Sequence, residues 1–366
     1  MIFLHARPRQ IFLVLLLLAL HGTTFAACLS PAAEPQTISA NDGGIGGTGM
    51  VAEGGIGGTG IVGTITGFAS VCINGLEVEF DESTTVRSNH ETSGLQQLAI
   101  GQVIAINAVN DTHGLRAEKI DILNAVEGRI SMINLARSTL QVLGQTILIT
   151  PATQFTGITK INDMTLDMPI KISGYRNAEN AIVATRIALT IGLQTSSVIG
   201  VVEQADDGQY RIAGLVLAGE TASLAVGSES LLSGSFDGQL LHISRVQNNP
   251  SVPFANTAQR VVIEGLLLAE PGAQQLKISG FEIDYTGLRT AATKLEIGQM
   301  LRVTGQLTAG RHIKAQHLQL MPHLLPAMTS NHNMAERMQH RDTMTRPMTM
   351  TRPNTPMPQN MPMMRR

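Results

Sequence analysis

Short apolar runs separated by turn signals dominate the chain from residue 61 to residue 320, and they recur in the same order four times. Each unit opens with an apolar–x–Gly element rich in β-branched residues. The glycines of these openings are spaced by 65, 72 and 65 residues, at Gly63, Gly128, Gly200 and Gly265. This regularity predicts four copies of one small structural module.

Three further elements follow each opening. The first is a hairpin in which apolar and polar residues alternate on both sides of a turn glycine, most clearly at Asn74-Gly75. The second is a Leu-x-Ile-Gly turn and the strand after it, which is clear at 98–106 and 295–303 and weaker at 166–172 and 224–231. The last is a closing strand, at 115–122, 181–189, 240–246 and 312–318.

These elements predict an all-β protein with about five strands in each unit of roughly 65 residues. Five short antiparallel strands close most economically into a small barrel, which also removes exposed strand edges. We therefore expect tandem OB-like or SH3-like barrels. The expected modules are residues 61–125, 126–192, 196–250 and 260–320.

The flanking segments have a different composition. Residues 1–27 combine Arg7 and Arg9, an apolar run at 11–20 and small residues near Ala27, as a cleavable export signal does. Residues 28–60 contain two Gly-Gly-Ile-Gly-Gly-Thr-Gly copies, and we expect a disordered Gly-rich linker there. Residues 321–366 hold 11 of the 17 methionines and seven prolines without apolar periodicity, which predicts a disordered Met-rich tail.

The net charge of −2 conceals an acidic body. Because the first 27 residues carry +2 and the last 46 carry +4, residues 28–320 carry −8. Binding to a phosphate backbone needs clustered Lys and Arg, so this charge argues against nucleic-acid binding by the modules.

The two cysteines allow two interpretations. Cys28 lies where a lipoprotein signal places its lipidated cysteine, after two small residues, although Phe25 stands where Leu is usual. Lipidation of Cys28 is the preferred interpretation, and it predicts a lipid anchor in the membrane. The alternative is a disulfide between Cys28 and Cys72 in an oxidising compartment.

The body shows no recognisable catalytic or metal motif. The G-x-G-x-x-G matches in the linker lack the preceding strand and following helix that dinucleotide binding needs. Five carboxylates alternate with apolar residues on expected strands, so we interpret them as solvated outer-face residues: Glu118, Asp121, Glu127, Glu264 and Glu282. We expect a protein that is not an enzyme and has no resident cofactor.

The tail suggests one alternative function. Thioether sulfurs favour Cu(I), and methionine and histidine recur there at short spacings. The candidate copper ligands are Met334, Met338, Met344, Met348, Met350, His332 and His340.

Several of these motifs together resemble a known family. They are the Ile-Gly-Gly-Thr-Gly leader, the opening at 63–68, the Asn74-Gly75 hairpin, the turn at 98–103 and the closing strand at 182–187. They are similar to those of bacterial exported proteins that carry domain of unknown function 5666. The resemblance covers residues 43–190 well and 196–320 more weakly. It implies repeated small β modules, export and frequent lipid anchoring, and it supplies no catalytic residues.

The expected function is therefore that of a non-enzymatic cell-envelope protein in the periplasm or at the outer membrane. Its modules would act as a spacer or as a binding platform for a protein or glycan partner. The alternative is a copper-binding envelope protein that acts through its tail.

Overall fold

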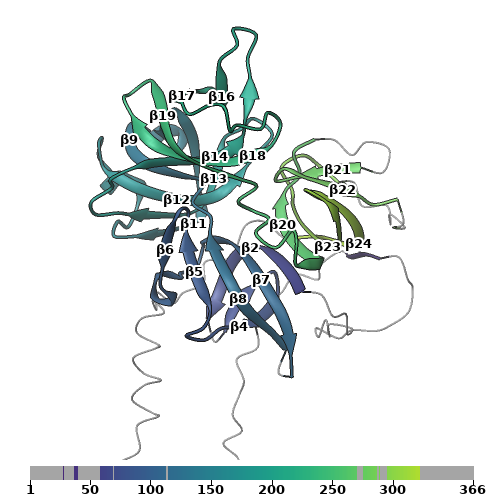
Figure 1. Ribbon diagram of the computed structural model, residues 1–366. Coiled ribbons are helices and arrows are strands. Elements are labelled where there is room, and N and C mark those ends of the chain that lie inside the picture. The colour runs from purple at the N-terminus through teal and green to yellow at the C-terminus, as the bar shows by residue number, and fades with distance from the viewer. Residues whose placement is uncertain are drawn as a thin grey trace, which may run out of the picture.

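The computed structural model describes residues 28, 37–39, 58–68, 70–112, 114–269, 275–286, 288 and 295–321. These residues form an all-β protein of small five-stranded units (Figure 1). The described residues outside the strands are turns and three short 3-10 helices, η1 (Leu95–Gln97), η2 (Leu135–Arg137) and η3 (Ile161–Asp163).

One strand plan occurs in all four units. The first strand pairs with the second and with the fourth. The second strand also pairs with the third, and the fourth with the fifth, and all four of these pairings are antiparallel. The third and fifth strands pair in parallel. This order, 1-2-3-5-4-1, is a Greek-key barrel and corresponds to the OB-like of the two expected folds.

Barrels 1 and 2 close completely, as their continuous pairings show. Barrel 1 also carries the hairpin of β5 (Thr85–Ser88) and β6 (Glu91–Ser93). The five strands of barrel 1 are β2 (Gly58–Phe68), β3 (Val71–Ile73), β4 (Leu76–Glu79), β7 (Val103–Asp111) and β8 (Gly114–Ile122). Those of barrel 2 are β9 (Val126–Asn134), β10 (Thr139–Val142), β11 (Gln145–Thr156), β12 (Pro169–Arg176) and β13 (Ile182–Leu189).

Barrels 3 and 4 follow the same plan with one irregularity each. In barrel 3 the first strand is interrupted at Val202, and its two parts pair with different neighbours. In barrel 4 a single bridge from Leu267 to Ile278 closes the first strand against the second. The strands of barrel 3 are β14 (Ser196–Val201), β15 (Glu203–Gln204), β16 (Tyr210–Ile212), β17 (Leu215–Gly219), β18 (Glu229–Phe236) and β19 (Leu240–Asn248). Those of barrel 4 are β20 (Ala258–Leu266), β21 (Gln275–Ile278), β22 (Phe281–Asp284), β23 (Met300–Ala309) and β24 (His312–Leu320).

The Leu-x-Ile-Gly turn has the same backbone role in every barrel. Its last residue has a positive φ of 87° at Gly101, 62° at Asp167, 79° at Gly227 and 84° at Gly298. In each barrel the amide of this residue donates to a carbonyl in the first strand or directly after it, as Gly101 does to Ile65 and Gly298 to Leu267. The four turns are therefore structurally equivalent, including the two whose sequence signal was weak.

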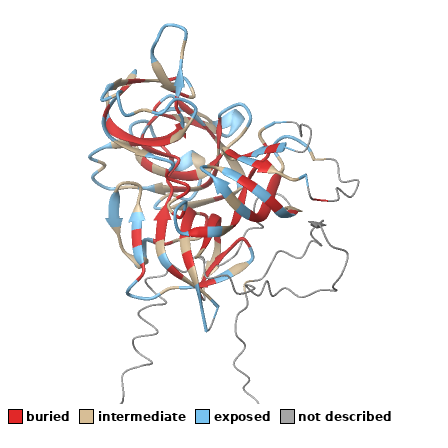
Figure 2. Ribbon diagram, turned by 45° about the vertical axis from the view of Figure 1, so that its right-hand side comes forward, coloured by how far each residue is buried: buried red, intermediate tan, exposed pale blue. Residues whose placement is uncertain are grey.

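The barrels are paired rather than strung out in a line. The first strands of barrels 1 and 4 pair in parallel, Ile61 opposite Val262, and the first strands of barrels 2 and 3 pair antiparallel, Val126 opposite Val198. One hydrophobic cluster fills barrels 2 and 3 together, and another joins the interior of barrel 4 to residues of the other three barrels. Figure 2 shows the buried residues along the barrel strands and where barrels meet.

Three parts of the expected linker belong to the folded body, and one of them is residues 58–60 at the start of β2. Strand β1 (Thr37–Ser39) pairs antiparallel with β24, and Cys28 is bonded to barrel 1. The interpretation of residues 28–60 as a linker alone is therefore too simple. A three-residue strand is too short to give a periodic signal, and its pairing depends on an edge that lies about 280 residues later in the sequence.

Candidate functional site

A cavity of about 130 Å³ lies where the four barrels meet. Val62 and Val103 of barrel 1 line it, together with the end of β12 in barrel 2. Barrels 3 and 4 complete the walls, which are mostly apolar with a few polar groups. They contribute the apolar side chains of Ile199, Leu268 and Phe281 and the carboxylates of Glu203, Glu229 and Glu264. The cavity thus exists only while all four barrels hold their relative positions.

Arg176 connects barrel 2 to barrel 3 at this cavity. Its Nε and Nη2 donate to the carbonyl of Ile199 at 3.2 and 2.8 Å, and its Nη1 donates to the carbonyl of Asn180 at 2.9 Å. Burial lowers the pKa of Arg176 to about 10, while the nearby carboxylates of Glu229 and Glu203 oppose that shift. The guanidinium therefore stays charged at neutral pH, with its donors directed at backbone carbonyls.

Glu229 connects barrel 3 to barrel 4. Its Oε2 accepts a hydrogen bond from Ser251 Oγ at 2.6 Å and forms an ion pair with Arg311. The guanidinium of Arg311 lies 4.4 Å from the centre of the Phe281 ring and also donates to the carbonyl of Gly280. Charge and a cation–π contact together hold this wall of the cavity.

Two buried contacts lie between barrels 1, 2 and 4. The hydroxyls of Tyr175 in barrel 2 and Thr64 in barrel 1 lie 2.9 Å apart. The backbone of Thr64 also donates to the carboxylate of Glu264 in barrel 4, and within that barrel Arg302 Nη2 donates to Glu264 Oε1 at 2.8 Å. Burial raises the pKa of Glu264, and the Arg302 guanidinium opposes that shift. Burial also raises the pKa of Tyr175, so its hydroxyl keeps its proton and remains a donor.

A second polar cluster joins barrels 1, 2 and 3 around Glu127. Its Oε1 accepts hydrogen bonds from Asn124 Nδ2 at 2.6 Å and from Asn89 Nδ2 at 3.2 Å. Asn89 also donates to Ser197 Oγ at 2.9 Å, while Lys171 lies 3.9 Å from the carboxylate. Burial raises the pKa of Glu127, and the charge of Lys171 opposes the shift.

These clusters correct the prediction that the strand carboxylates are solvated. Glu127 and Glu264 are each 8% exposed and Asp121 is 5% exposed, whereas Glu118 and Glu282 are exposed as expected. Neighbouring barrels cover the outer faces at Glu127 and Glu264, whereas β5 of barrel 1 itself pairs alongside Asp121. Alternation within a strand identifies the outer face and gives no information on what packs against it.

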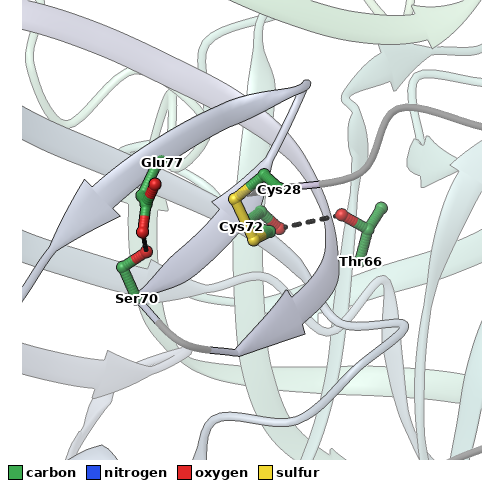
Figure 3. The surroundings of a disulfide bond; sticks show 5 residues. All are labelled: Cys28, Thr66, Ser70, Cys72 and Glu77. Carbon is green, nitrogen blue, oxygen red and sulfur yellow. Dashed lines mark hydrogen bonds between the residues drawn. A yellow bond between two sulfur atoms is a disulfide. The ribbon is translucent and has the colours of Figure 1, made fainter. Parts of the chain in front are cut away.

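The cysteines form a disulfide between Cys28 and Cys72, with Cα atoms 5.5 Å apart (Figure 3). Around it, Thr66 Oγ1 donates to the carbonyl of Cys72 at 3.2 Å, and Ser70 Oγ donates to Glu77 at 2.7 Å. A sulfur bonded to another sulfur cannot also carry a thioether lipid. The structure therefore has the disulfide of the alternative interpretation.

The candidate copper ligands, from His332 to Met350, lie outside the described residues. Among the residues that are described, no group of three or more His, Cys, Asp or Glu side chains is arranged to hold a metal ion. No helix in the described part of the chain is long and apolar enough to cross a membrane.

Sequence reasoning missed the residues that surround the cavity. No motif distinguishes the charged residues there, and each stands in or beside an ordinary strand: Arg176, Glu229, Arg302 and Arg311. The contacts of Arg176 with Ile199 and of Arg311 with Glu229 span 23 and 82 residues of sequence and connect different modules, whose packing a repeat pattern leaves open.

Comparison with known proteins identifies the first half of the body. Residues 59–121 and 127–188 each match domain of unknown function 5666, and these stretches coincide with barrels 1 and 2. No curated protein and no solved structure matches the chain. Barrels 1 and 2 thus correspond to two tandem copies of domain of unknown function 5666.

Proposed function

We propose that this protein is an exported, non-enzymatic binding protein of the cell envelope, whose four barrels form one platform for a protein or glycan partner. The observation that carries the proposal is the cavity at the junction, which is lined by all four barrels. Apolar walls with a few fixed polar groups are typical of ligand sites.

The arrangement of the barrels favours a platform over a spacer. A spacer gains length by placing modules end to end, whereas here β2 of barrel 1 pairs with β20 of barrel 4. The first and last modules are therefore neighbours. The charged groups at the junction are held in ion pairs and backbone hydrogen bonds, which suits positioning of a ligand.

Export is supported by two features of the chain. The N-terminal pattern of residues 1–27 has the three parts of a secretory signal, and disulfides such as Cys28–Cys72 persist in oxidising compartments. We propose the periplasm or the cell exterior as its location, with the disulfide in place of a lipid on Cys28.

A substitution at the mouth of the cavity tests the proposal. Val201 lines the cavity and is 38% exposed, so Val201→Trp fills the mouth without replacing a buried side chain. Val226 is 54% exposed and lies outside the lining, so Val226→Trp is the matched control. We expect calorimetric titration with soluble peptidoglycan fragments and short peptides to give binding that Val201→Trp abolishes and Val226→Trp leaves intact. Binding that is the same in both variants would contradict a role for the cavity.

The second candidate function is copper binding by the tail, and it rests on the Met and His spacing between residues 328 and 364. Thioethers bind Cu(I) without losing a proton, so such a segment could act at any envelope pH.

A further inference from the structure

The fifth strand of every barrel contains a bulge followed by an equivalent three-residue segment. In each case the segment pairs antiparallel with the fourth strand, as Ile120 does with Ile106 and Leu318 with Val303. The middle residue is apolar and faces the barrel interior. The four segments are 119–121, 186–188, 245–247 and 317–319.

In three barrels a further stretch of β-strand covers the free edge of this segment. In barrel 1 it is β5, with Val86 opposite Ile120, and in barrel 2 it is the far end of β11, with Phe155 opposite Ile187. In barrel 4 it is β1, with Ile38 opposite Leu318. Each covering segment has an apolar residue between two polar ones: Thr85-Val86-Arg87, Gln154-Phe155-Thr156 and Thr37-Ile38-Ser39.

Barrel 3 differs from the other three. Its segment, Arg245-Val246-Gln247, pairs with β18 on one side, and within the described residues no strand pairs with the other side. Val246 is accordingly only partly buried, whereas Ile120, Ile187 and Leu318 are at most 1% exposed. The edge thus combines unpaired backbone groups with an incompletely covered apolar side chain.

We propose that this edge of β19 accepts an extended polypeptide strand from a protein partner. Addition of a strand to a sheet edge is an established mode of peptide recognition, in which main-chain hydrogen bonds give affinity and alternate side chains give specificity. The proposal names the kind of partner for the platform proposed above and rests on that function.

The covering strands of the sister barrels indicate the chemistry of the partner. Its central residue is β-branched or aromatic and packs on Val246, as Val86 packs on Ile120. The residue opposite Arg245 is neutral or acidic, since Thr85 lies opposite Lys119 and Gln154 opposite Arg186. Barrel 4 shows that the strand need not belong to the barrel, because β1 comes from the other end of the chain.

A tethered strand provides the test. The sequence of residues 83–89, which contains β5, is appended to the C-terminus of the full mature chain through a flexible Gly/Ser linker. Hydrogen exchange is then measured for the amides of residues 243–248. The matched control carries Asp in place of the appended copy's valine.

We expect exchange of these amides to slow by about tenfold or more with the tethered strand, because a flexible tether gives a mM effective concentration. The control, and the tethered chain with Val246→Asp, should exchange like the chain without the added strand. Slow hydrogen exchange of the amides in the buried strand β13 serves as the control that each variant is folded.

Three results would overturn the proposal. The first is unchanged exchange in the tethered chain. The second is protection of β19 in the original chain that depends on protein concentration, which would assign the edge to a second copy. The third is protection that disappears on truncation after Met321, which would assign it to the chain's own tail. None of these results depends on the Val201→Trp test of the cavity.

Discussion

Gly63 lies directly against Asn74, so closely that a Cβ on Gly63 would approach Asn74 Oδ1 to 1.8 Å. The hairpin of barrel 1 folds over the first strand at this point, and Asn74 Nδ2 donates to the carbonyls of Val62 and Val262. The opening glycines of the other barrels meet the same hairpin turn: a Cβ would reach Val142 from Gly128, Ile212 from Gly200 and Ser279 from Gly265. The repeated glycine therefore marks a close approach of two strands.

Gly63→Ala should destabilise barrel 1. The added methyl group would collide with Asn74, and such overpacking costs about 1–3 kcal/mol or more. Gly67→Ala is the control, because a Cβ there meets Cys72 at an ordinary 3.8 Å. Denaturant unfolding measures both variants, and equal stabilities would show that the close approach at Gly63 does not exist.

Gly101→Val and Gly298→Val should both destabilise the protein, by unequal amounts. Both glycines have φ above 80°, where a β-branched residue is strained by about 1–3 kcal/mol. At Gly101 a Cβ would also come within 2.9 Å of the carbonyl of Thr185 in barrel 2, whereas nothing lies within 4 Å at Gly298. A thermal shift that is larger for Gly101→Val is the expected result, and no shift in either variant would refute the equivalence of the turns.

Glu127 should make the protein less stable as pH rises. Burial raises the folded-state pKa of Glu127 above its ordinary value of 4.5, so the folded protein binds a proton that the unfolded chain has released. Stability is then lost as the pH rises from about 4.5 through the folded-state pKa. Glu127→Gln removes this titration. Urea unfolding between pH 4 and pH 8 should show the variant gaining stability relative to the original protein, and a constant difference would contradict the prediction.

The disulfide should be visible in the intact mass of the mature protein. We expect a soluble species lighter by two hydrogens than the reduced chain, because Cys28 and Cys72 are bonded. Replacing both cysteines with serine should cost about 2–4 kcal/mol, since the bond closes a long loop in the unfolded chain. A membrane-bound species that begins at Cys28 with added acyl mass would instead establish lipidation.

The tail is tested as a peptide of residues 328–364. If it binds Cu(I) through its methionines, it should compete with a Cu(I) chelator at micromolar metal, and replacing its methionines with leucine should abolish the competition. Failure of the unmodified peptide to compete would exclude the copper hypothesis.

The sequence predicted the barrels because their signals are local. The hairpin at Asn74-Gly75 and the turns at Gly101 and Gly298 each depend on residues close together in the chain, where alternation and glycine placement are informative. The third barrel was harder to recognise, since its turn at Gly227 continues with Ser228 and its first strand is interrupted.

The junction could not be predicted in the same way. Glu264 alternates with apolar residues as a solvated residue would, yet it is buried where β2 of barrel 1 pairs with β20 and the backbone of Thr64 donates to its carboxylate. The pairing of β1 with β24 likewise involves three residues and a partner from the other end of the chain. Packing between modules depends on surfaces that no repeat pattern specifies.

The parallel pair of β2 and β20 also constrains the order of assembly. If the chain is exported as proposed, barrel 1 emerges first, yet the strand that pairs with the free edge of β2 follows about 200 residues later. During translocation the β2 edge stays open while barrels 2 and 3 are still emerging, and an open edge invites pairing with other chains. Such a protein would gain from a periplasmic chaperone that shields that edge until the last barrel arrives.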